Sequence, residues 1–371
     1  MSEIPDASTV DMNFAGPQFE TLLEELESLS AQLESSTDEW PTVQIESLAE
    51  TGVLGWVIPK QYGGPEISQQ ELTAGYEKLA TACLTTAFVL TQRNGACQRI
   101  VGCDNDNLKA DLLPDLCSGK TFATVGVSHL TTSRQHIKKP AVQVRLTDAD
   151  VIFNGSVPWV TGANHADYIV TGGTCDDGTQ VLAAIPTAHD GITVNQPPRL
   201  LALNASQTGS VELQDVQIPR RFLIAGPIEG VMKQGTGGGT GSLTTSSLAI
   251  GAAECSLNRL KHEADNRPDL VEIYEPMAAE RNTLSADLLQ AAAAISSESN
   301  PALQMESIRQ RANSLVIRAA QASLGAAKGA GFVHGHPAER AVREAMFFLV
   351  WSCPQPVLTA ALREFACVLE A

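Results

Sequence analysis

Along the 371 residues of the chain, the predicted secondary structure changes from helices to strands and back to helices. This order restricts the fold more than any other feature. From about Phe19 to Leu116, apolar residues recur at three- and four-residue spacing, which predicts helices. Between Phe122 and Phe222, β-branched runs separated by Gly, Asp, Asn and Pro predict strands. Alanine-rich segments at 244–264, 271–298 and 302–328 then predict long, closely packed helices. A doubly wound sheet and a TIM barrel, which need alternating strands and helices, are excluded.

We therefore expect an α+β fold in three parts. These are an N-terminal helical domain over 1–120, a middle β-domain over 121–224 and a C-terminal helical bundle over 225–371. A glycine-rich stretch, Gly235–Gly241, follows the β-domain. Prolines at 354 and 356 divide two further helices, which we expect at 337–350 and 355–370.

Composition narrows the classes of partner. The net charge of −17 disfavours nucleic acid or an anionic membrane surface as the main partner. No apolar run is long enough to span a bilayer, and Met1–Phe14 lacks the regions of a signal peptide. Eight scattered cysteines without a CxxC pair are typical of reduced thiols, so we expect a cytoplasmic protein. His334 and His336 form an H-x-H pair without further ligands at suitable spacing, so no metal site is expected.

Segments at Gly52–Gly64, Asn154–Thr161, 205–219 and Gly331–Ala345, in this order, resemble those of the acyl-CoA dehydrogenase family. Gly52–Gly64 matches G-x-x-G-x-x-x-P-x-x-Y-G-G, and Asn154–Thr161 is similar to N-G-x-K-x-W-I-T. Ala205–Thr208 with Asp215–Pro219 is the third, and Gly331–Ala345, continuing without a gap to Arg363-Glu364, is the fourth. The resemblance implies that family's fold, with a middle β-barrel or sandwich and a C-terminal four-helix-type bundle. It also implies FAD, held between the β-domain and the C-terminal helices.

The resemblance assigns flavin contacts within the β-domain. Trp159 would pack beside the isoalloxazine ring and Thr161 would hydrogen-bond it, whereas the alternative for Trp159 is a core tryptophan on a strand. Val127 and Ser128, on an expected strand from Val125 to His129, would contact the pyrimidine edge, with Ser128 in place of a threonine. The family's following G-S-D is absent from residues 130–134.

A second set of contacts concerns the FAD pyrophosphate. Arg267 falls where the family has an arginine that binds the pyrophosphate of a neighbouring subunit, and a guanidinium suits two phosphates. Leu270 and Val271 replace the phenylalanine and glycine of that motif. Lys328 and Gly329 stand in the family's glycine-rich segment, where Lys328 would add positive charge to the phosphate site or would be a solvated loop lysine.

The residues for proton abstraction differ from the family's pattern. Ser352, in Trp351-Ser352-Cys353-Pro354, stands where the family carries its catalytic glutamate, and serine has too high a pKa to act as a base without an activator. The alternative position of the glutamate corresponds to Gly241 or a neighbour, and Asn204 replaces an arginine. Glu254 has two possible roles: a catalytic base displaced from the family's position, or a carboxylate that lies on the surface or forms an ion pair.

Three functions remain open. The first is an FAD-dependent oxidoreductase that oxidises a CH–CH bond of an acyl-CoA-like or other small substrate with an altered base. The second is a reduced-flavin-dependent monooxygenase, with Ser128 and His129 near the oxygen adduct. The third is a non-catalytic flavin- or partner-binding protein. The resemblance implies a homodimer or homotetramer, with an electron-transfer flavoprotein or a flavin reductase as a further partner.

Overall fold

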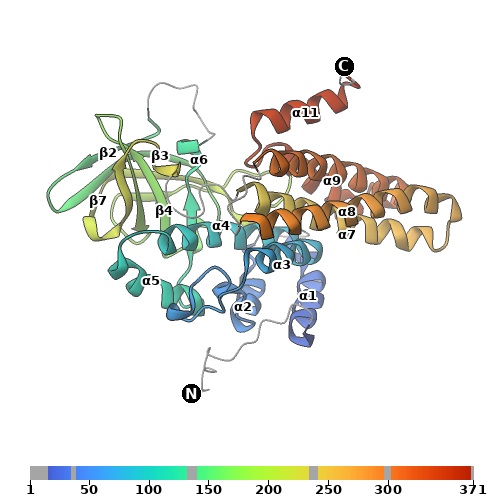
Figure 1. Cartoon of the computed structure of the whole chain (residues 1–371), viewed down its shortest axis with the longest axis horizontal. Coiled ribbons are helices and arrows are strands. Elements are labelled where there is room, and N and C mark those ends of the chain that lie inside the picture. Colours follow the sequence, from blue (N-terminus) through green and yellow to red (C-terminus); the bar gives the residue numbers. More distant parts are fainter. Residues whose placement is uncertain (1–15, 35–38, 132–139, 234–240, 296–301, 369–371) are drawn as a thin grey trace.

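A computed structural model describes residues 16–34, 39–131, 140–233, 241–295 and 302–368. Three layers follow one another along the chain (Figure 1). A sheet lies at one end of the molecule, a bundle of long helices lies at the other, and the first helices run beneath both. This is the expected α+β architecture. Most of the glycine-rich stretch 235–241 and part of 130–134 lie outside the described residues.

The N-terminal part consists of α1 (Pro17–Ser30), α2 (Thr42–Glu50), α3 (Gln69–Ala82), α4 (Leu84–Val101) and α5 (Asp106–Ser118). Ser68 begins α3 with a capping box, because its hydroxyl accepts from the amide of Glu71 while the Glu71 carboxylate accepts from the amide of Ser68. Arg93 of α4 is fully buried and donates to the carbonyls of Leu54 and Leu116. This guanidinium joins the Gly52–Gly64 segment to the end of α5, so that segment has a structural role.

The middle part is one curved sheet, whose strands are β1 (Ala123–Gly126), β2 (Val142–Leu146), β3 (Asp150–Val160), β4 (Tyr168–Thr174), β5 (Gln180–Pro186), β6 (Ile192–Val194), β7 (Gly209–Pro219) and β8 (Leu223–Ile228). The strand order is β6-β7-β3-β2-β4-β5-β8, and β1 pairs with β4 in parallel. Alternating buried positions along β2 and β7 place one face on the core. The domain boundary expected at 224 falls within β8.

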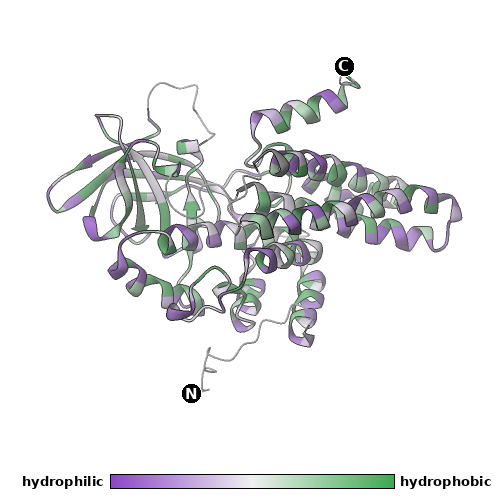
Figure 2. Ribbon diagram, in the orientation of Figure 1, coloured by the Kyte–Doolittle hydropathy of each residue, from purple (hydrophilic) through white to green (hydrophobic). Residues whose placement is uncertain are grey.

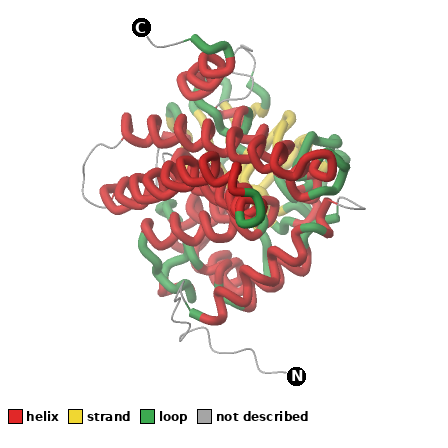
Figure 3. The backbone as a smooth tube through the Cα atoms, turned by 90° about the vertical axis from the view of Figure 1, so that its right-hand side faces the viewer, coloured by secondary structure: helices red, strands yellow, loops and turns green. Residues whose placement is uncertain are grey.

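The C-terminal part is built on α7 (Gly241–Ala264), α8 (Val271–Ile295) and α9 (Ala302–Gly331), close to the expected ranges. Figure 2 shows the amphipathic character of these helices, and Figure 3 shows them in front of the strands. The helix expected at 337–350 is instead α10 (Pro337–Ala345) followed by a 3₁₀ turn, η10 (Met346–Leu349). The last helix, α11 (Gln355–Phe365), packs on α9 and ends before the expected residue 370.

Contacts between the parts fix the sheet relative to the bundle. Helix α4 packs on β1, and α3 packs on α7 and α8. Among the described helices, none is both long enough and apolar enough to cross a membrane.

Candidate active site

The carboxyl ends of β1 and β3 lie side by side. A Cβ atom added to Gly126 at the end of β1 would stand 2.8 Å from Val157 and 2.9 Å from Val160 of β3. The hydroxyl of Thr124 donates to the carbonyl of Thr161 at 2.7 Å. Two predicted flavin segments, Val127-Ser128 and Trp159 to Thr161, are therefore neighbours in space although they are about thirty residues apart in sequence.

Ser128 begins a single helical turn, α6 (Ser128–Thr131), so the expected strand from Val125 to His129 is wrong beyond Gly126. The turn forms because the amide of Leu130 donates to the carbonyl of Val127 at 2.9 Å. The Ser128 hydroxyl is buried and has no hydrogen-bond partner within the described part of the chain. A buried hydroxyl without a partner costs free energy, and a bound polar group would remove that cost.

Trp159 and Thr161 differ in exposure. The Trp159 side chain is 48% exposed, which excludes the alternative of a core tryptophan. Thr161 is buried, and its hydroxyl lies 2.9 Å from the hydroxyl of Thr208, which in turn lies 2.9 Å from that of Ser206. The Ala205–Thr208 segment thus supplies hydroxyls that orient Thr161, while a large aromatic surface beside it remains open to a ligand.

His129 is held by the sheet. Its Nε2 atom lies 2.9 Å from the carbonyl oxygen of Gly172 on β4, which makes Nε2 the protonated nitrogen and the donor. This nitrogen is therefore committed to the backbone.

Asn204, which stands in place of the family's arginine, closes a loop. Its side-chain oxygen accepts from the amide of Leu200 at 2.7 Å, and its side-chain nitrogen donates to the Leu200 carbonyl at 3.1 Å. Both polar ends of this side chain are used by the loop, so Asn204 stabilises local structure.

Ser352 lies in the turn between η10 and α11, where α11 begins (Figure 1). Its φ of 44° is left-handed and its side chain is exposed. The neighbouring Trp351 ring stacks on Phe347 with centroids 5.1 Å apart and meets the edge of Phe88 at 5.0 Å. Within the described residues, no imidazole or carboxylate is hydrogen-bonded to Ser352, so this serine lacks an activating base.

Arg309 of α9 supports this turn from inside the bundle. Its guanidinium donates to the carbonyls of Phe348 at 3.4 Å and Trp351 at 3.2 Å, and burial lowers the pKa of Arg309 to about 10. Arg309 remains charged at neutral pH. Arg309 is one of three arginines in an alanine-rich helix, and the sequence offered no signal that distinguishes it from the other two.

Glu254, the possible displaced base, is in an ion pair. Its carboxylate lies 2.9 Å from Nε of Arg281 on α8. Nearby, Glu77 of α3 accepts from the hydroxyl of Ser285 at 2.7 Å, and burial raises the pKa of Glu77. The structure therefore gives Glu254 the pairing role among the helices α3, α7 and α8.

The predicted pyrophosphate residues lie elsewhere. Arg267 follows α7, at the end of the bundle away from the sheet (Figure 1), and donates to the carbonyl of Ala326 at 2.7 Å. Carboxylates of Glu263 and Asp269 lie 3.7 and 3.8 Å from its guanidinium. Lys328 and Gly329 are exposed near the end of α9, and Lys328 has a left-handed φ of 56°. Arg267 therefore contacts the last turns of α9, and neither of them lies near Ser128 and Trp159 within this chain.

Comparisons with known proteins agree with these features. Residues 20–120 match the family model for the acyl-CoA dehydrogenase N-terminal domain. The chain is 25% identical over 229 residues to the probable acyl-CoA dehydrogenase YngJ of Bacillus subtilis, a match that covers 60% of each protein. It is 25% identical over 350 residues to 3-sulfinopropanoyl-CoA desulfinase of Cupriavidus necator, covering 85% of this chain and 84% of that one. These similarities support the acyl-CoA dehydrogenase family for this chain. A solved glutaryl-CoA dehydrogenase from Mycobacterium smegmatis, in complex with FADH2, has the same fold, with a TM-score of 0.79 and 17% identity over 94% of this chain and 95% of that one.

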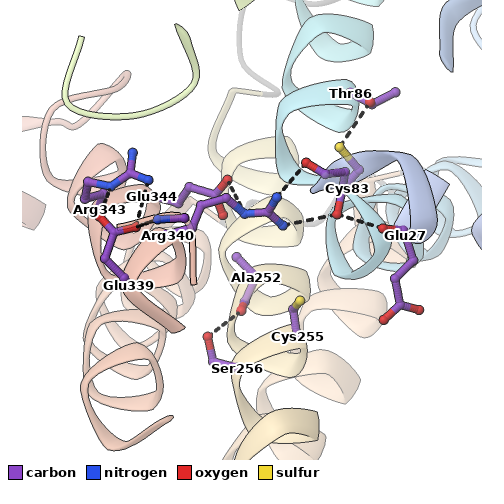
Figure 4. A network of polar contacts seen from close by, with 12 residues as sticks. Glu27, Cys83, Thr86, Ala252, Cys255, Ser256, Glu339, Arg340, Arg343 and Glu344 are labelled. Atoms are coloured by element: carbon purple, nitrogen blue, oxygen red, sulfur yellow. Dashed lines mark hydrogen bonds and ion pairs between the residues drawn. The ribbon is translucent and has the colours of Figure 1, made fainter. Parts of the chain in front are cut away.

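The family segment around 337–343 is structural in this member. Arg340 of α10 donates to the carbonyl and hydroxyl of Ser30 at 2.6 and 3.1 Å, and it pairs with Glu344 at 3.5 Å (Figure 4). Arg343 pairs with Glu339 at 2.5 Å and donates to the carbonyl of Leu201 at 3.0 Å. These arginines tie α10 to α1 and to the loop that leads into β7.

The H-x-H pair belongs to the same segment. His336 accepts from the amide of Ala338 at the start of α10, and His334 lies 3.5 Å from Glu339. Both histidines therefore have roles at a helix N-terminus.

Proposed function

We propose that this protein is an FAD-dependent oxidoreductase that acts on a CoA thioester or a similar small acyl substrate without the family's usual glutamate. One observation carries the proposal. The Ser128 hydroxyl, which is buried without a partner among the described residues, follows the end of β1, and the half-exposed ring of Trp159 belongs to the neighbouring end of β3. A polar donor beside an open aromatic surface is what a flavin ring system requires.

The residues present fit a flavin. Ser128 would hydrogen-bond its polar edge, Trp159 would cover one face and exclude water, and the backbone at Val127 would line the same edge. Thr161 keeps donor or acceptor capacity beyond its bond to Thr208. When bound, the flavin supplies a hydride acceptor. The solved relative that carries FADH2 supports this assignment.

The pyrophosphate contacts support an assembly of identical chains. Because Arg267 and Lys328 lie at the opposite end of the bundle from Ser128, they would contact only the cofactor of another copy. Glu263 and Asp269 would oppose a phosphate there, so Arg267 would have to exchange these partners for the ligand. We therefore propose a homodimer or homotetramer in which FAD bridges two chains.

The absent glutamate restricts the reaction. Removal of an α-proton by a positioned base contributes about 10²–10⁴-fold to the rate, and neither exposed Ser352 nor paired Glu254 provides such a base. The relative named 3-sulfinopropanoyl-CoA desulfinase suggests a substrate to test beside ordinary acyl-CoAs. A substrate that needs no base at position 352 would suit the site as it stands.

The test is to purify the protein, record its flavin spectrum and titrate it anaerobically with acyl-CoAs and with 3-sulfinopropanoyl-CoA. Bleaching of the flavin by an acyl-CoA, or turnover of any CoA thioester, supports the proposal. An S352E variant serves as a check, because it restores a carboxylate at the family's position and should increase the rate of bleaching. Rapid adduct formation from reduced flavin and O₂ would instead favour a monooxygenase. Protein that binds no flavin would overturn the proposal in favour of a non-catalytic role.

A further inference from the structure

A cavity of about 390 Å³ lies between α1, α3, α7, α9 and the start of α10. It is lined by Glu27 of α1, Cys255 and Arg259 of α7, Ser323 of α9 and His336, the N-cap residue of α10. This volume is within the range of small-molecule sites. Ser128, Trp159 and Thr161 do not line it, whereas Glu263, which pairs with Arg267, does.

Two arginines stand at this junction, and they differ in their partners. Arg340 spans the gap between α10 and α1, where its guanidinium is bound to Ser30 and paired with Glu344 (Figure 4). Arg259 is partly buried in the cavity wall and has no carboxylate within ion-pair distance among the described residues. Its hydrogen bond goes to the sulfur of Cys255 at 3.1 Å. A thiol does not neutralise a guanidinium, so Arg259 is a cation without an anion.

A second polar group in the wall is also without a partner. Ser323 is 2% exposed, and its hydroxyl makes no hydrogen bond within the part of the chain that the structure describes. An arginine and a buried hydroxyl left unsatisfied in one cavity wall indicate a site for a polar ligand, because each carries a cost that a ligand would remove.

The remaining charges restrict the kind of ligand. Two carboxylates line the cavity: Glu27, which is exposed, and Glu263, which lies 3.7 Å from Arg267. A simple anion attracted to Arg259 would meet the negative charge of Glu27, whose carboxylate has no ion-pair partner among the described residues. A molecule with a carboxylate and an ammonium group would pair with both Arg259 and Glu27.

We propose that this cavity binds a small zwitterion of the amino-acid type, with its carboxylate on Arg259 and its ammonium group toward Glu27. The cavity shares no lining residue with Ser128, Trp159 and Thr161, which would hold the flavin ring, and a bound ligand would stabilise the junction of α1, α7, α9 and α10.

The test uses isothermal titration calorimetry on the full chain with glycine, 4-aminobutyrate and 6-aminohexanoate, and with butyrate, butylamine and inorganic phosphate as single-charge or anionic controls. We expect saturable binding of at least one amino acid in the series. Butyrate and butylamine should bind about tenfold or more weaker than 4-aminobutyrate if that member binds best. R259M should weaken amino-acid binding about tenfold or more, and E27Q should reduce the preference for the amino acid over the carboxylate. R145M, at an exposed arginine on β2, is the matched control and should bind as the wild type does.

Three results would overturn the proposal. These are no binding by any member of the series, equally tight binding of butyrate or phosphate, and unchanged affinity in R259M. Flavin content and the melting temperature of R259M are measured in parallel. A folded R259M protein with the wild-type flavin content shows that a loss of amino-acid binding reflects this cavity and not the flavin site.

Discussion

Ser128→Ala should have opposite effects on two quantities: it should stabilise the flavin-free protein and weaken its binding of FAD. In the free protein the Ser128 hydroxyl is buried without a partner in the described part of the chain, which costs about 1–3 kcal/mol. Ser128→Ala removes that cost without leaving a cavity, so the flavin-free protein should gain about 1–3 kcal/mol of unfolding free energy. The same free energy is lost from binding, because FAD no longer satisfies the hydroxyl. FAD should therefore bind about 5- to 150-fold more weakly.

The assay combines urea unfolding of the flavin-free protein with an equilibrium FAD titration. Ser256→Ala is the control, since Ser256 is also a serine with little exposure but donates to the carbonyl of Ala252 at 3.2 Å. It should lose about 0.5–1.5 kcal/mol of stability and keep its FAD affinity. A Ser128→Ala protein that is less stable than the wild type, or that binds FAD as tightly, would refute the reasoning.

Two further predictions concern the packing of α3 on α7. Gly251→Ala would place Cβ 2.3 Å from the Glu77 carbonyl, so urea unfolding should show a loss of about 1–3 kcal/mol, whereas Gly325→Ala, with no atom within 4 Å, should be neutral or gain up to about 1 kcal/mol. Equal effects of the two substitutions would contradict the close approach of the helices. Burial raises the pKa of Glu77, so its ionisation costs stability in the folded state. The unfolding free energy should fall as pH rises from the ordinary carboxyl range through the raised pKa, and Glu77→Gln should reduce this fall. Identical pH profiles of the wild type and Glu77→Gln would contradict the raised pKa of Glu77.

The sequence predicted the larger units of the fold because their signals are long and periodic. The alanine-rich runs gave α7 and α9 to within three residues at each end. Short elements were less predictable. Val125 and Val127 indicated a strand through His129, but the carbonyl of Val127 accepts from Leu130 and turns the chain into α6 after Gly126.

The sequence predicted which residues form the candidate site, but it did not predict their burial, hydrogen bonding or backbone conformation. Resemblance identified Ser128 and Trp159, whereas the missing partner of one and the exposure of the other depend on packing between strands. The sequence also placed Ser352 at the family's glutamate position without showing its left-handed backbone or the buried Arg309 behind it. The cavity beside Arg259 was not predictable, because helices from both ends of the chain form it.

The central claim is that the ends of β1 and β3 hold a flavin. The most direct measurement is the fluorescence of FAD titrated with flavin-free wild-type protein and with Trp159→Ala. Because the Trp159 ring is half exposed, its removal should leave the fold intact. We expect quenching that saturates at one FAD per chain in the wild type and an affinity at least about tenfold weaker in the variant. Unquenched fluorescence in the wild type, or equal affinity in Trp159→Ala, would contradict it.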